Sequence, residues 1–114
     1  MAVITAAPTE RDIRLLHETA RIASESKAQG NHPFGALLAD RDGNILMEQG
    51  NEVVSDHNDC AHAETLLLFR ASKAYGREFL STCSLYASVE PCAMCAGALY
   101  WANVGRLVFG MTES

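Results

Sequence analysis

Two short segments of the sequence carry the residue types that bind zinc. The first is Ala61–Glu64, which contains His62, and the second contains Cys92 and Cys95 directly after Pro91. Zinc prefers a tetrahedral set of nitrogen and sulfur ligands, and a catalytic site keeps one of the positions open for water. His62, Cys92 and Cys95 would supply three ligands, so we expect one zinc ion per chain with water as the remaining ligand.

The spacing of these residues favours a catalytic zinc site. Cys92 and Cys95 are three residues apart, which on a helix places both sulfurs on one face, and a helix N-terminus favours the thiolate form. Glu64 follows His62 by two residues, close enough to take a proton from bound water without binding the metal. Zinc lowers the pKa of bound water toward about 7, so hydroxide could add to an amidine-like ring carbon and release ammonia. The pair of motifs, His-x-Glu at 62–64 and Pro-Cys-x-x-Cys at 91–95, resembles the signature of zinc deaminases. The resemblance implies hydrolytic deamination, with Glu64 as the catalytic residue that moves the protons.

A closed structural zinc site and a redox-active pair of cysteines are the alternatives to this interpretation. Either would be favoured if the Cys92–Cys95 pair stood alone, because such pairs occur in both classes of protein. Glu64 argues for catalysis, since a structural site has no need of a carboxylate that lies beside the metal without binding it.

Helix and strand signals alternate along the chain, which predicts a layered α/β domain. The expected helices cover 10–29, 62–75 and 91–101, and the expected strands cover 34–39, 44–49, 85–89 and 106–109. Thr9 and Asp12 can cap the first helix together. We expect the apolar face of that helix to consist of residues at helical spacing, namely Ile13, Leu16, Ala20 and Ala23.

The connections in this scheme place the chemistry at helix starts. The turn 40–43 contains Gly43, which can supply a positive φ, so the first two strands are expected to form an antiparallel hairpin. Pro91 suits the first turn of a helix, where its missing N–H costs nothing. Both zinc-binding segments then lie at the N-terminus of an apolar helix.

Composition and charge narrow the class of protein. With 114 residues, of which 48% are hydrophobic, the chain is expected to form a single domain over 1–114. Proteins that bind nucleic acids usually carry a basic stripe on their surface. The net charge of −5 and the scattered Lys and Arg residues therefore argue against a nucleic-acid partner. No segment approaches the roughly 18 apolar residues of a membrane span. The first eight residues lack the features of a signal peptide, so we expect a cytoplasmic protein.

Several motifs together resemble the cytidine/deoxycytidylate deaminase superfamily. They are Asn31–Ala36, Gly50–Asn51, Ala61–Glu64, Leu85–Cys92 and Ala96–Ala102. Within it, the Tyr-Trp-Ala ending at residues 100–102 makes the chain most similar to guanine deaminases and small bacterial nucleoside deaminases. The resemblance covers about residues 10–112 and implies a three-layer α-β-α fold with a mixed central sheet. Such relatives continue past the position of Ser114, so it also implies that the last helix and strand of the family are absent.

The resemblance implies further site residues. Asn51 matches an asparagine that hydrogen-bonds the substrate ring, Phe34 would flank the base together with His62, and Ala63 would offer backbone contacts. Trp101 matches a residue at the dimer interface of guanine deaminases, close to the neighbouring site, and a homodimer is expected. For two other residues, His32 and Glu90, a structural role and a contact with the substrate both stay open.

The resemblance implies a small nucleobase or nucleoside as substrate, with conversion of guanine to xanthine and ammonia, a step of purine metabolism, as the first hypothesis. Cytosine or cytidine and tRNA adenosine are the alternatives within the enzyme class, because the ring atoms attacked are chemically alike. A hypothesis of another class is a non-catalytic zinc-binding module used for assembly. It predicts bound zinc without turnover of any nucleobase.

Overall fold

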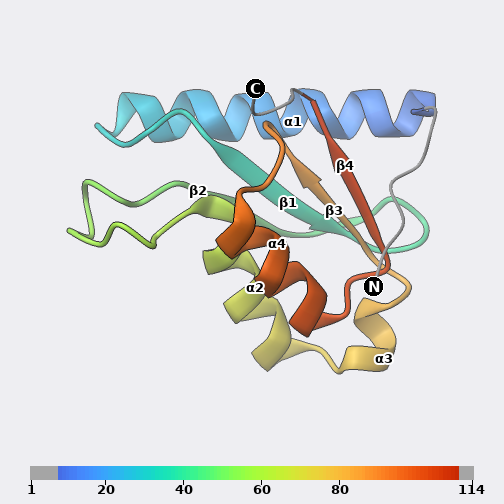
Figure 1. Ribbon diagram of the computed structural model, residues 1–114. Coiled ribbons are helices and arrows are strands. Elements are labelled where there is room, and N and C mark those ends of the chain that lie inside the picture. Colours follow the sequence, from blue (N-terminus) through green and yellow to red (C-terminus); the bar gives the residue numbers. More distant parts are fainter. Residues whose placement is uncertain (1–7, 111–114) are drawn as a thin grey trace.

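The computed structural model describes residues 8–110 (Figure 1). Residues 1–7 and 111–114 lie outside the described residues. The prediction that the N-terminus is not a signal peptide concerns this undescribed part of the chain. The elements in chain order are α1 (Glu10–Ala28), β1 (Gly35–Ala39), β2 (Ile45–Gly50), α2 (Ala63–Ala74), α3 (Arg77–Leu80), β3 (Ser84–Ala87), α4 (Ala93–Ala102) and β4 (Arg106–Phe109). Among the described residues, no helix is long and apolar enough to cross a membrane.

The four strands form one mixed sheet in the order β2-β1-β3-β4. β1 runs antiparallel to both of its neighbours, whereas β3 and β4 are parallel. The hairpin between β1 and β2 is the predicted one. Gly43 has a φ of +87° in its turn, and the Asp40 carboxylate accepts the backbone N–H groups of Asp42 and Asn44. The sheet and its helices confirm the predicted α/β fold class with a mixed sheet.

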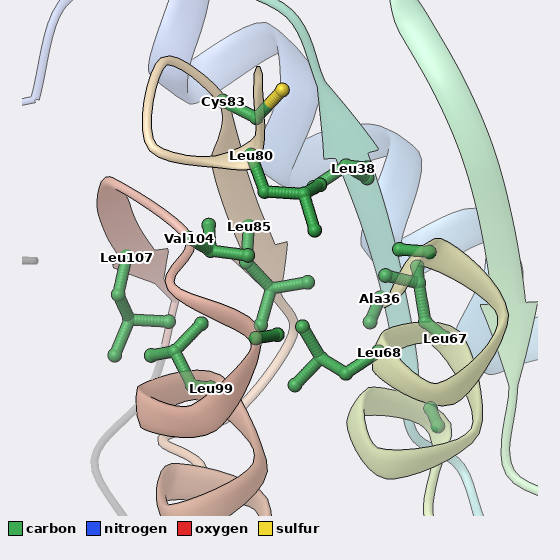
Figure 2. Packing of buried hydrophobic residues seen from close by; sticks show 13 residues of the cluster. Ala36, Leu38, Leu67, Leu68, Leu80, Cys83, Leu85, Leu99, Val104 and Leu107 are labelled. Carbon is green, nitrogen blue, oxygen red and sulfur yellow. The ribbon is translucent and has the colours of Figure 1, made fainter. Parts of the chain in front are cut away.

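Successive side chains along each strand point to opposite faces of the sheet, so the interior is divided into two hydrophobic clusters, one on each face. Figure 2 shows the larger cluster, where side chains from α2 and α4 meet the strands. Its members include Ala36, Leu38, Leu67, Leu68, Leu85 and Leu99. The smaller cluster lies under α1 and consists of Leu15, Ile22, Leu37, Ala39, Tyr86 and Val108. Helix α1 therefore forms one outer layer, and α2 with α4 forms the other (Figure 1).

The predicted apolar face of α1 is wrong in part. Ala23 is buried and Leu16 is half-buried, but Ile13 is 48% exposed and Ala20 is also exposed. The buried face instead contains three polar residues beside Leu15, Ile22 and Ala23, namely Asp12, Thr19 and Ser26. Each of the three has a hydrogen-bond partner, which lowers the cost of its burial. A count of apolar residues along the helix could not identify this face.

The other elements follow the predicted ones with shifts of one or two residues at their ends, and α3 is an addition. The capping box of Thr9 and Asp12 is present, because each side chain accepts the other's backbone N–H. α3 has only four residues, too few to show a helical period in the sequence. Its Leu80 is buried in the larger cluster, so this turn adds a residue to the core.

Candidate zinc centre and active site

The zinc-binding segments cap two helices that lie side by side. His62 is the N-cap residue of α2 and Cys92 is the N-cap residue of α4, both with extended backbone. Their carbonyls accept the first helical hydrogen bonds, from Leu66 N at 3.0 Å and Ala96 N at 2.8 Å. Neither side chain makes a capping bond to its own helix. Both side chains can therefore bind a metal ion instead.

The ligand atoms have the spacing that zinc requires. His62 Nδ1 lies 3.5 Å from Cys92 Sγ and 3.7 Å from Cys95 Sγ, and the three ligand atoms all lie within 4.8 Å of one another. Zinc bonds of about 2.3 Å to sulfur and about 2.0 Å to nitrogen, at a tetrahedral angle, place those two atoms about 3.5 Å apart. His62, Cys92 and Cys95 therefore fit a zinc ion, and three ligands leave one tetrahedral position open.

Cys95 is the buried ligand of the three. Burial raises the pKa of its thiol to about 12, although a hydrogen bond from the Thr65 hydroxyl, with its oxygen 3.1 Å from Cys95 Sγ, acts in the opposite direction. A helix N-terminus favours the thiolate, whereas burial favours the neutral thiol. The positive charge of a metal ion bound here would stabilise the thiolate.

Glu64 faces the same cavity as the zinc ligands. It is the second residue of α2 and is only 8% exposed. The cavity has a volume of about 200 Å³, and His62, Glu64 and Cys92 form part of its lining. A carboxylate beside an open metal position, and outside the ligand set, can accept and return a proton.

Asn51 lines the cavity in a fixed orientation. Its backbone carbonyl accepts the hydroxyl of Ser26 at 2.7 Å, and its backbone N–H donates to Phe34 O at 3.1 Å. Its side-chain Oδ1 accepts the N–H of Val53 at 2.9 Å. With Oδ1 engaged in this way, the Asn51 amide nitrogen is the donor that can face a ligand.

The rest of the lining contains one residue from the predicted set and three outside it. Phe34, which we expect to flank a base, lines the cavity and lies directly before β1. His32, Val89 and Glu90 also line it. The sequence left His32 and Glu90 open between two roles, and the structure places both beside the zinc ligands. Val89 carried no signal, because an apolar residue at the end of a strand is ordinary core material.

Ala63 and Trp101 are not among the described residues that line the cavity. Ala63 is fully buried at the first position of α2. Trp101 is 74% exposed in the last turn of α4, where its ring makes an edge-on contact with Tyr100 at 5.3 Å between centroids. The Trp101 carbonyl accepts a hydrogen bond from Arg77. The roles expected for these two residues stay predictions.

Comparison with known proteins agrees with this geometry. Residues 9–111 match the cytidine and deoxycytidylate deaminase zinc-binding region. The probable cytosine deaminase of Schizosaccharomyces pombe is 38% identical over 105 residues, which are 92% of this chain and 63% of that protein. The tRNA-specific adenosine deaminase of Haemophilus influenzae is 34% identical over 105 residues, covering 92% of this chain and 61% of that protein.

A solved structure gives the same result. The crystal structure of guanine deaminase from Bacillus subtilis superposes with a TM-score of 0.80 at 36% identity, covering 88% of this chain and 64% of that one. In all three comparisons the chain spans less than two thirds of the other protein's length. The zinc-binding triad, the mixed sheet and these matches together show that the chain belongs to the cytidine and deoxycytidylate deaminase family.

Proposed function

We propose that residues 1–114 form one zinc-dependent deaminase domain that hydrolyses the amino group of a free nucleobase, with guanine as the preferred substrate. The observation that carries this proposal is the position of Glu64, which shares a cavity with His62 and Cys92 but is not one of the three residues whose ligand atoms converge. A closed structural site has no use for such a carboxylate.

The residues divide the reaction between them. When bound, zinc supplies a water molecule of lowered pKa. Glu64 accepts one proton from the attacking water and gives it to the ring nitrogen, and it then carries the second proton, from the hydroxyl that has been added to the ring carbon, to the leaving amine. Asn51 holds the ring through its amide N–H, and Phe34 packs beside it. Water oxygen bonds to the ring carbon that carried the amine, and ammonia leaves.

Three observations support a free base, and guanine first. The cavity of about 200 Å³ is smaller than the roughly 300 Å³ at which sites for drug-sized ligands begin. The donor that Asn51 presents needs an acceptor on the ring, and the oxo groups of guanine and cytosine both provide one. The likeness to the Bacillus subtilis guanine deaminase points the same way. The likeness to the Schizosaccharomyces pombe enzyme favours cytosine as the second candidate, since it extends over 105 residues.

The test is release of ammonia from guanine, cytosine, adenine and their nucleosides by zinc-loaded protein. We expect turnover of guanine and a loss of about 10²- to 10⁴-fold in kcat for Glu64→Gln, with zinc content unchanged. Glu78→Gln, which changes an exposed carboxylate on α3, is the matched control and should keep full activity.

Other outcomes decide between the alternatives. Turnover of cytosine or adenosine in place of guanine would keep the mechanism and change the substrate. One zinc per chain without turnover of any base would favour the assembly module. Full activity in Glu64→Gln would overturn the mechanism.

We also propose that the protein forms a homodimer through the outer faces of α2 and α4. Phe69 is 63% exposed on α2, and Tyr100 and Trp101 are exposed on α4. Large aromatic side chains that are exposed to water favour association with another protein surface. Trp101→Ser should shift the mass measured by sedimentation toward the monomer. Ile13→Ser, which changes an exposed apolar residue on the opposite layer, should leave it unchanged. A monomeric wild-type protein would contradict this proposal.

A reducing, cytoplasmic location is proposed as well, because the zinc site needs reduced cysteines.

A further inference from the structure

The hydroxyl of Thr65 makes a buried hydrogen bond to one of the zinc ligands. Thr65 Oγ1 lies 3.1 Å from Cys95 Sγ, and both residues are buried. The bond joins the third residue of α2 to the third residue of α4. We propose that Thr65 is a positioning residue of the zinc centre, which orients Cys95 and reduces the negative charge that its sulfur gives to the metal.

The bond is unusual for a threonine within a helix. Such hydroxyls commonly donate to a carbonyl three or four residues earlier on the same helix, as Thr19 does to Leu16 O at 2.6 Å. For Thr65 the carbonyl four residues earlier belongs to Ala61, which accepts the backbone N–H of Glu52 at 3.0 Å. The Thr65 hydroxyl reaches across to the neighbouring helix instead.

The direction of this bond follows from the chemistry of a metal ligand. A cysteine that binds zinc is a thiolate and has no proton to donate, so the threonine hydroxyl must be the donor. A hydrogen bond to a coordinating group fixes its orientation and changes the electron density that the metal receives. Because Cys95 is fully buried, no water is available to replace the hydroxyl if it is removed.

The inference rests on the zinc centre of the proposed function but not on its substrate, so its test uses metal binding. Thr65→Val removes the hydroxyl at nearly constant volume, and Thr65→Ser restores it. Thr19→Val is the matched control, since it removes a buried hydroxyl from α1, on the opposite face of the sheet. Zinc affinity is measured by competition with a chromophoric chelator. Cobalt(II) in place of zinc reports on the sulfur ligands through its thiolate-to-metal charge-transfer band.

We expect Thr65→Val to weaken zinc binding about tenfold and to move the charge-transfer band to longer wavelength, because the sulfur lone pair is no longer stabilised. Thr65→Ser should recover the wild-type band and affinity, and Thr19→Val should change neither. If Thr65→Val does not fold, Thr65→Ala should give the same shift.

Two results would overturn the proposal. A band and a zinc affinity in Thr65→Val equal to those of the wild type would show that the hydroxyl does not act on Cys95. A wild-type protein that gives no thiolate charge-transfer band would remove the zinc centre itself. If the wild-type protein shows the expected metal spectra but releases no ammonia from any base, the proposed function is contradicted and the role of Thr65 stands.

Discussion

Asp12 is a buried carboxylate whose partners come from two strands of the sheet. Two nitrogens of the Arg106 guanidinium lie 2.8 and 2.6 Å from its two oxygens, and the Tyr86 hydroxyl donates to it at 2.6 Å. The Arg106 hydrogen bonds hold the pKa of Asp12 well below its usual range, against the effect of burial. A buried charge with matched partners is tolerated, and a buried charge that has lost one partner is costly.

Asp12→Asn should therefore destabilise the protein, because it leaves the Arg106 guanidinium facing an amide. We expect a loss of about 3 kcal/mol in the free energy of unfolding at neutral pH. The depressed pKa means that the contribution of Asp12 is complete above the unfolded value of about 4 and is lost as pH falls below it. Urea denaturation of both proteins at pH 7 and at about pH 3 should show the difference shrinking in acid. A difference that grew in acid would contradict the sign.

At the scale of elements, Gly35 lets α1 lie directly on β1. A Cβ at this position would lie 2.7 Å from Thr19 O and 2.8 Å from Ala23 N, both backbone atoms of α1. Gly35→Ala must push the helix away from the sheet, which we expect to cost about 1–3 kcal/mol. Gly97→Ala is the control, since a Cβ there meets no atom within 4 Å, and it should stabilise α4 by roughly 0.5–1 kcal/mol. Equal thermal stability of the two variants would show that the contact is not tight.

The loop between β2 and α2 carries Asn51 and is fixed by Asn31. Asn31 Oδ1 accepts the N–H groups of Val54 at 3.0 Å and Ser55 at 2.9 Å, and its amide donates to Ser55 Oγ at 3.1 Å. Asn31→Ala should raise amide hydrogen exchange at Val54 and Ser55. It should also raise KM more than it lowers kcat, because the segment next to Val53, whose N–H holds the Asn51 side chain, loses two of its hydrogen bonds. Asn31→Asp keeps both backbone bonds and should retain slow exchange. Unchanged amide exchange at Val54 and Ser55 in Asn31→Ala would show that the loop keeps its conformation without Asn31.

At the scale of the whole molecule, the sequence predicted most of the layered arrangement and the zinc triad, because both depend on local patterns. His62, Cys92 and Cys95 are recognisable by type and spacing, and helix starts place them. The buried face of α1 was not predictable in the same way. Asp12 is buried because of Arg106, which lies 94 residues away in the sequence, and no local period contains that information. His32 and Glu90, which line the cavity, were open because a local pattern does not show which way their side chains point.

A zinc ion held by His62, Cys92 and Cys95 would join the two helices that cover one face of the sheet. His62 belongs to α2 and the two cysteines to α4, while Leu68 and Leu99 pack the same helices into the larger cluster (Figure 2). A ligand that binds only the folded state adds about 2.7 kcal/mol at a concentration 100 times its Kd, and about 1 kcal/mol shifts the Tm of a domain near this size by roughly 4 °C or more.

Chelation should therefore lower the Tm of the protein by roughly 10 °C. The change should be uneven across the layers, with faster amide exchange in α2 and α4 than in α1, whose contacts with the sheet involve none of the ligands. His62→Ala should melt at the same temperature with and without chelator, since it cannot complete the site. A chelator effect that persists in His62→Ala, or that is equal in all three helices, would mean that zinc stabilises the fold by some other route than joining α2 to α4.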